Sequence, residues 1–92
     1  AKGAARLDAV HPARRMIWIA ETVYGDETWY RADTEHNGEP IALVVFPAGR
    51  NRWDACAGLG STMDIAHRGS DIASERTAER AKASAAGWAE GV

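Results

Sequence analysis

A six-residue apolar run near the middle of the chain constrains the fold. Residues 41–46 are Ile-Ala-Leu-Val-Val-Phe, with Pro40 before them and Pro47 after them. A short run of this kind, rich in β-branched residues, is typical of a strand that is covered on both faces. The sequence therefore predicts a central strand at residues 41–46, with other elements packed on either side of it.

Two further strands are expected before this run. Residues 15–24 are rich in aromatic and β-branched side chains and end at Gly25-Asp26, as a strand before a turn does. Residues 28–33 form a short second strand that pairs with the first across this turn. Asn37-Gly38 is a strong signal for a tight hairpin turn. The first half of the domain is therefore predicted to be an antiparallel sheet.

The second half begins with a clearly alternating strand. After a hairpin loop at residues 47–51, apolar and polar side chains alternate over residues 52–59. Successive side chains of a strand point to opposite faces, so Trp53 is predicted to point inward and Cys56 to lie on the other face.

The last part of the chain is expected to contain a small hairpin and then a helix. Asp-Ile-Ala occurs at residues 64–66 and again at 71–73, which favours a hairpin, with a helix that starts at Asp71 as the alternative. Residues 77–90 form the C-terminal helix, with Thr77 as its N-cap. The apolar stripe of this helix should face the sheet: Ala78, Ala81, Ala85, Trp88 and Ala89. The charged residues off this stripe should face water: Glu79, Arg80 and Lys82.

These elements define an α+β domain, in which a mostly antiparallel sheet of four to five short strands is packed by one C-terminal helix. Ninety-two residues correspond to one domain at the small end of the usual range. Residues 1–14 show no sustained period and carry more basic than acidic side chains, so they are predicted to be a flexible basic arm. Residues 15–92 are predicted to be the single folded domain.

Cysteine content and hydropathy favour a cytoplasmic protein. Cys56 is the only cysteine, so an internal disulfide is impossible and a reducing compartment fits. No apolar run approaches the roughly 18 residues that cross a membrane. The first residues also lack the apolar core of a signal peptide. We therefore expect no membrane partner.

The residue types that carry catalysis are present, but their spacing is not catalytic. The three histidines lie far apart in sequence, and Asp64 and His67 would point to opposite faces of a strand. Nothing near Cys56 provides a helix N-terminus that would lower the pKa of its thiol. Residues 58–62 are glycine-rich, yet they lack a following Lys and open no clear helix. The sequence therefore predicts no enzyme, no metal and no cofactor.

Charge and aromatic residues are concentrated in one segment. Residues 21–39 hold six acidic side chains and a single Arg, although the net charge of the whole chain is only −2. Aromatic residues and Arg are enriched at the centres of binding interfaces. We therefore predict that a partner is bound by this segment and its neighbours: Trp18, Glu21, Asp26, Glu27, Trp29, Tyr30, Arg31, Asp33 and Glu35.

The order of several short strands and one alanine-rich helix, which includes Thr-Ala-Glu-Arg-Ala-Lys-Ala-Ser-Ala at residues 77–85, resembles small proteins encoded by phages and mobile elements. Anti-CRISPR proteins are among them. The resemblance is architectural and covers residues 15–92, so it assigns no role to any residue. It implies a compact protein of the host cytoplasm that occupies a surface on a larger complex.

Three functional hypotheses follow. The first is a non-enzymatic inhibitor, such as an anti-CRISPR protein, whose acidic segment docks on a host protein or ribonucleoprotein complex. The alternative is a small nucleic-acid-binding module that uses Trp and Arg on a sheet face left open by the single helix. The third is a homodimer formed through that open face.

Overall fold

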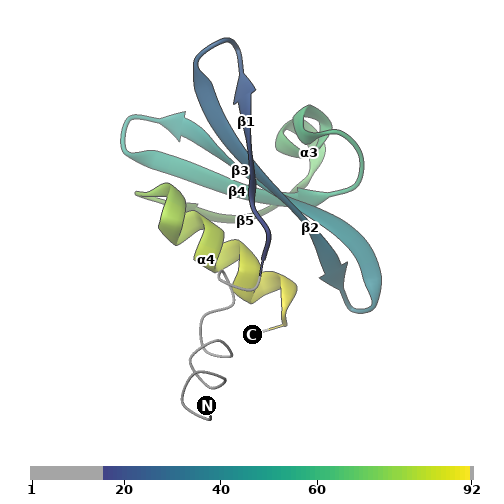
Figure 1. Cartoon of the computed structure of the whole chain (residues 1–92). Coiled ribbons are helices and arrows are strands. Elements are labelled where there is room, and N and C mark those ends of the chain that lie inside the picture. Colours follow the sequence, from purple (N-terminus) through teal and green to yellow (C-terminus); the bar gives the residue numbers. More distant parts are fainter. Residues whose placement is uncertain (1–15, 92) are drawn as a thin grey trace, which may run out of the picture.

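The strands form a meander in which each strand pairs with the next one along the chain (Figure 1). The computed structural model describes residues 16–91, so the predicted arm at residues 1–14 lies outside the described residues. Within the described part, five antiparallel strands lie in the order β1-β2-β3-β4-β5. The elements are β1 (Ile19–Val23), β2 (Glu27–His36), β3 (Glu39–Gly49), β4 (Arg52–Gly58), α3 (Thr62–Arg68), β5 (Ser70–Glu75) and α4 (Ala78–Ala89). The predicted α+β class, with a C-terminal helix on the sheet, is confirmed.

β3 is the central strand, as predicted, and its middle is buried on both faces. It runs from Glu39 to Gly49 and is therefore longer than the predicted residues 41–46, since it includes the two flanking prolines, Pro40 and Pro47. Pro40 pairs with β2 but lies beyond the residues of β3 that pair with β4, and Pro47 pairs with β4 but lies beyond those that pair with β2. A proline lacks an amide hydrogen and is tolerated where one side of the strand is unpaired.

The turns of the first half explain where β1 and β2 begin and end. Asn37-Gly38 forms the predicted tight turn, with φ of 54° and 81°, the left-handed geometry that two-residue hairpins require. Tyr24 has a φ of 56° and belongs to the first turn rather than to a strand. β1 is therefore shorter than the predicted strand at residues 15–24, whereas β2 extends past the predicted residues 28–33 to His36.

The prediction of a small hairpin after β4 is wrong, since α3 and β5 lie there instead. Ser61 caps α3: its side-chain oxygen accepts a hydrogen bond from the backbone N–H of Asp64 at 3.1 Å. The glycine-rich residues 58–62 thus do open a helix, although a short one. β4 ends at Gly58, so Leu59 is 74% exposed and does not continue the inward alternation.

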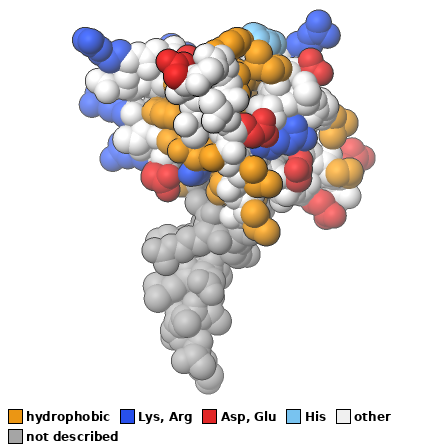
Figure 2. Space-filling model, turned by 45° about the horizontal axis from the view of Figure 1, so that its top comes forward, with side chains coloured by type: hydrophobic (Ala, Val, Ile, Leu, Met, Phe, Trp, Pro, Cys, Tyr) orange, Lys and Arg blue, Asp and Glu red, His pale blue; other side chains and the backbone are white. Residues whose placement is uncertain are grey.

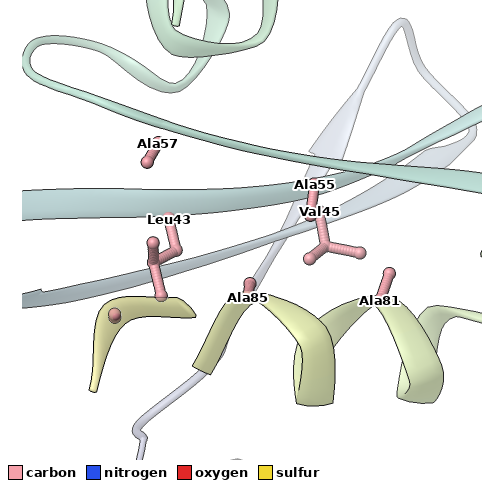
Figure 3. Packing of buried hydrophobic residues seen from close by; sticks show 7 residues of the cluster. Leu43, Val45, Ala55, Ala57, Ala81 and Ala85 are labelled. Carbon is pink, nitrogen blue, oxygen red and sulfur yellow. The ribbon is translucent and has the colours of Figure 1, made fainter. Parts of the chain in front are cut away.

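α4 covers one face of the sheet, as its alanine stripe predicts. Side chains of β3 and β4 point toward the small residues of α4 in Figure 3. Trp53 packs on this face and Cys56 on the other, which confirms the prediction from their spacing. Lys82 corrects one expectation: its ammonium lies 3.8 Å from the centre of the Tyr30 ring rather than in open water. The members of the buried cluster are Leu43, Val45, Ala55, Ala57, Ala81, Ala85 and Ala89.

The opposite face is not the open sheet face that one helix would leave. α3 packs on it, and Ile65 of α3 is buried against β2, β3 and β4. The buried cluster on this face consists of Trp29, Ala42, Val44, Cys56 and Ile65. We call the two sides of the sheet the α4 face and the α3 face.

Candidate protein-binding surface

The predicted binding residues are divided between the two faces of the sheet. Paired residues of antiparallel strands share a face, and Glu21 pairs with Trp29. Strand alternation then places the following residues of the predicted set on the α3 face: Glu21, Glu27, Trp29, Arg31, Asp33 and Glu35. Trp18 and Tyr30 pack against the cluster under α4 instead. The structure therefore does not bring these two aromatic residues together with the acidic ones.

Trp29 is a core residue rather than an exposed anchor, because only 4% of its surface is accessible. Its ring centre lies 5.0 Å from that of Phe46 and 5.9 Å from that of Tyr24, which meets it edge-on at 76°. Its indole N–H donates to Oε1 of Glu27 at 3.0 Å. Trp29 is therefore a buried residue of the α3 face, and the rings of Tyr24 and Phe46 pack against it.

Tyr24 is the aromatic residue that the sequence analysis missed at this site. It is 64% exposed, and its ring lies edge-on to the buried Trp29. The position of Tyr24 next to Gly25-Asp26 was a signal that it belongs to the turn. Phe46 of β3 was also missed, since only the register of β2 on β3 places it beside Trp29.

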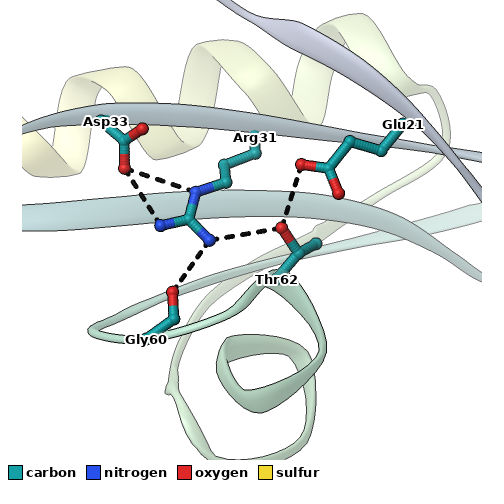
Figure 4. A network of polar contacts seen from close by, with 5 residues as sticks. All are labelled: Glu21, Arg31, Asp33, Gly60 and Thr62. Atoms are coloured by element: carbon teal, nitrogen blue, oxygen red, sulfur yellow. Dashed lines mark hydrogen bonds and ion pairs between the residues drawn. The ribbon is translucent and has the colours of Figure 1, made fainter.

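Arg31 is committed to contacts within the protein (Figure 4). Its guanidinium donates to Asp33 at 3.2 and 3.3 Å, to the carbonyl oxygen of Gly60 at 2.9 Å, and to the hydroxyl of Thr62 at 3.3 Å. The Thr62 hydroxyl in turn donates to Glu21 at 3.1 Å. These bonds hold the start of α3 on the sheet, so Arg31 has a structural role and little capacity left for a partner.

Within the described residues, the acidic side chains of the first hairpin are not paired with a basic side chain, as Asp33 is with Arg31. Glu21 and Glu27 accept hydrogen bonds from neutral donors, the Thr62 hydroxyl and the Trp29 indole. Asp26 lies exposed in the turn. We define the acidic hairpin surface as Glu21, Tyr24, Asp26, Glu27 and the adjoining Phe46. It combines an exposed aromatic ring and three carboxylates, and the buried Trp29 lies beneath it.

Asp33 and Glu35 lie further along β2 and are less closely connected with this surface. Asp33 is paired with Arg31. Glu35 pairs in the sheet with Pro40, near the opposite end of β2 from Glu27. The acidic segment that the sequence shows as one cluster is thus spread over β1, the turn after it, β2 and the start of β3. Figure 2 shows hydrophobic side chains gathered between scattered acidic and basic ones, rather than a continuous field of one sign.

Cys56 is not placed or activated as a nucleophile. Its thiol lies 3.4 Å from Oδ1 of Asp71, and burial is the main cause that raises its pKa to about 12. The hydrogen bond to Asp71 and the charges of Asp71 and Asp54 act in the same direction. A thiol with this pKa is protonated at neutral pH and reacts slowly.

No metal-binding cluster of three or more His, Cys, Asp or Glu side chains occurs within residues 16–91. The prediction that Asp64 and His67 point to opposite faces of a strand is wrong. Both residues lie on α3, three positions apart, where side chains share one side of a helix.

Comparison of the chain with protein-family models, with curated proteins and with solved structures gives no match. Among the helices that the structure describes, none is long and apolar enough to cross a membrane.

Proposed function

We propose that the protein is a non-enzymatic, protein-binding inhibitor that docks through its acidic hairpin surface on a basic surface of a larger complex. One observation carries this proposal. The exposed Tyr24 packs edge-on against the buried Trp29, and the same hairpin carries the carboxylates of Glu21, Asp26 and Glu27. The guanidinium of Arg31 is already bonded to Asp33 and Thr62. An aromatic anchor with charges at its rim is the usual composition of a protein interface.

The chemistry of this surface defines the partner that fits it. Carboxylates on a rigid hairpin attract Lys and Arg side chains, and a protein surface rich in these residues commonly holds nucleic acid. The inhibitor would occupy such a surface and exclude the phosphate backbone by charge and by volume. A ribonucleoprotein of the host cytoplasm is the complex we propose, in the manner of an anti-CRISPR protein.

The geometry favours this proposal over direct binding of nucleic acid. A base-stacking platform needs exposed aromatic rings beside free cations. Trp29 is buried, and Arg31 and Arg52 are bonded to Asp33 and Asp54. The carboxylates of the acidic hairpin surface would also repel phosphates.

The proposal is tested by affinity capture from host lysate with the wild type and two charge variants. Asp26→Lys with Glu27→Lys changes the acidic hairpin surface. Glu39→Lys with Glu79→Lys changes the net charge equally, at exposed positions at the start of β3 and on α4. We expect the wild type and the Glu39/Glu79 control to capture the same nucleic-acid-binding protein, and the Asp26/Glu27 variant to lose it.

Nucleic acid provides the second arm of this experiment. An added RNA or DNA oligonucleotide should release the captured protein, because it competes for the same basic surface. The purified wild type should not bind that oligonucleotide by itself. Direct binding with a steep dependence on salt would instead support the nucleic-acid-binding module. Equal capture by both charge variants would contradict the proposal.

A further inference from the structure

β1 is an edge strand, and in the described part of the chain it pairs with β2 alone (Figure 1). Its register on β2 is unbroken from Ile19 to Val23, so the backbone groups that face away from β2 are regularly spaced. β5 at the other edge has a register shift in its pairing with β4, at Ala55/Cys56. An edge strand that contains neither a bulge nor a proline is a template on which another extended chain can add.

The α3 face of this edge carries an apolar and an acidic side chain side by side. Ile19 pairs with Arg31 and Glu21 pairs with Trp29, so both side chains lie on the α3 face. Ile19 is 58% exposed, and Ile17, two residues before it, is 80% exposed. Apolar surface at this edge is therefore continuous with the acidic hairpin surface, to which Glu21 belongs.

The charge of Glu21 decides which kind of chain fits this edge. Its carboxylate accepts a hydrogen bond from the Thr62 hydroxyl at 3.1 Å, and no basic side chain of the described residues pairs with it. Ala20 and Thr22, on the other face of β1, are exposed, so α4 leaves the edge accessible. Opposite charges attract across neighbouring strands and like charges repel. A basic segment therefore fits beside Glu21, and an acidic one does not.

We propose that the partner adds an extended segment to β1 as a further, antiparallel strand, and that this segment carries Lys or Arg two residues before Ile, Val or Leu. The proposal rests on the proposed function, because the occupant is a segment of the same basic partner. Every strand pair of the sheet is antiparallel, and the added pair continues this pattern.

The order of the two side chains follows from the direction of the added strand. An antiparallel segment passes Glu21 before it passes Ile19, so the basic side chain comes first and the apolar one comes two residues later. The residues of the segment before this basic position run past Val23 toward Tyr24 and Asp26. One chain can therefore occupy the β1 edge and the acidic hairpin surface together.

A synthetic peptide tests this pairing with a defined probe. The probe is Thr-Arg-Thr-Ile-Thr-Ile-Thr, in which Arg precedes Ile by two residues. The matched control, Thr-Ile-Thr-Ile-Thr-Arg-Thr, has the same composition and charge in the reverse order. In NMR titrations the probe should slow amide hydrogen exchange at the N–H groups of β1 that face away from β2. It should also bind about fivefold tighter than the control peptide.

Substitutions on the protein test the two side chains separately. Ile17→Thr with Ile19→Thr keeps the charge and the strand propensity and should weaken probe binding about fivefold. Leu59→Thr changes an exposed apolar residue outside β1 and should leave binding unchanged. Glu21→Gln keeps an acceptor for the Thr62 hydroxyl and should abolish the preference for the probe over the control peptide. Circular dichroism verifies that the variants are folded.

Three results overturn strand addition at β1. The first is a probe that does not bind at about 1 mM, or that binds without slowing exchange in β1. The second is equal binding of the two peptides to the wild type. The third is a wild type that sediments at twice the chain mass of 9.9 kDa and becomes monomeric in the Ile17/Ile19 variant, because a second copy would then occupy the edge.

Capture from host lysate separates this proposal from the proposed function. The Ile17/Ile19 variant should lose the captured protein, as the Asp26/Glu27 variant does. Capture that is lost by the Asp26/Glu27 variant and kept by the Ile17/Ile19 variant contradicts strand addition and leaves the proposed function intact. Equal capture by the Asp26/Glu27 variant and its Glu39/Glu79 control contradicts the proposed function, whatever the peptides show.

Discussion

At the scale of single residues, Cys56 shows how the surroundings of a side chain decide its chemistry. In sequence it is a lone cysteine in a strand of small residues. In the fold it lies at the centre of the cluster under α3 with Asp71 beside it, and its pKa rises from 9.0 to about 12. Burial and two negative charges all favour the neutral thiol, so the residue contributes packing and not reactivity.

This raised pKa predicts how stability depends on alkaline pH. Above pH 9 the unfolded chain loses the thiol proton, whereas the folded protein keeps it until about pH 12. Cys56 therefore stabilises the fold below pH 9, and this contribution is lost as the pH rises, by up to about 1.4 kcal/mol per pH unit. Urea denaturation between pH 7 and 11 should show a steeper loss for the wild type than for Cys56→Ala. Parallel curves would contradict the raised pKa.

Trp29 and Tyr24 show that the face of a side chain can be predicted from sequence more readily than its exposure. The nucleic-acid hypothesis placed Trp and Arg side chains on the face away from the C-terminal helix, and Trp29 does lie on that face. Whether that face was open depended on α3, and the contacts that bury Trp29 come from Phe46 in another strand and from Tyr24 in a turn. The sequence indicated where the acidic hairpin lies, but it predicted that Trp29, and not Tyr24, is the exposed aromatic residue.

At the scale of elements, two glycines that look equivalent in sequence have opposite roles. Gly69 joins α3 to β5, and a Cβ there would lie 2.5 Å from the carbonyl oxygen of Ile65 and 2.7 Å from that of Ala57. Gly87 lies within α4, where a Cβ would meet nothing within 4 Å. The first position requires the absence of a side chain, and the second only loses helix propensity.

Alanine substitution at the two positions should therefore have opposite effects. Gly69→Ala should destabilise the protein by roughly 2 kcal/mol or more, because backbone atoms of α3 and β4 must move apart. Gly87→Ala should stabilise it by about 0.5–1 kcal/mol through a better helix propensity and a less flexible unfolded chain. Thermal melting of the two variants beside the wild type checks both signs. A neutral Gly69→Ala would show that the backbone at Gly69 is not held this close to α3 and β4.

Long or strongly patterned elements were predictable from sequence, and short ones were not. The apolar run gave β3, the alanine spacing gave α4, and Asn37-Gly38 gave the turn between β2 and β3. α3 has seven residues, too few for a helical period to stand out. Ser61, whose side chain accepts from the backbone N–H of Asp64, is its clearest local signal, whereas the repeated Asp-Ile-Ala favoured a hairpin. The register between β2 and β3, which brings Phe46 beside Trp29, depends on the turn that joins them and cannot be recognised from either strand alone.

At the scale of the whole molecule, the acidic hairpin surface and the exposed isoleucines are neighbours, because Ile19 lies two residues before Glu21 on β1. The acidic hairpin surface lies on the α3 face at the Tyr24 end of the sheet, whereas the exposed isoleucines lie along the β1 edge. The Arg31 and Thr62 contacts hold α3 against β1 and β2, so the acidic hairpin surface is presented on a fixed scaffold. A rigid surface loses less conformational entropy when it binds.

This arrangement predicts that charge and aromatic contact act on different steps of partner binding. Long-range attraction by carboxylates speeds the encounter, whereas contacts made after docking set the lifetime of the complex. Asp26→Lys with Glu27→Lys should slow association roughly tenfold at low salt, with a smaller effect at high salt because of screening. Tyr24→Ala should leave association nearly unchanged and speed dissociation about tenfold or more, as loss of an aromatic anchor does.

Surface plasmon resonance with the captured partner, at two salt concentrations, separates these rates. Tyr24 is the residue to substitute, because it is exposed and its removal leaves the core intact. Trp29→Ala would instead remove a buried side chain beneath the acidic hairpin surface and cost about 3 kcal/mol or more of stability. The Glu39→Lys and Glu79→Lys control should change the association rate much less than Asp26→Lys with Glu27→Lys. If both charge variants slowed association equally, the net charge of the molecule would attract the partner, and the acidic hairpin surface would have no special part in recognition.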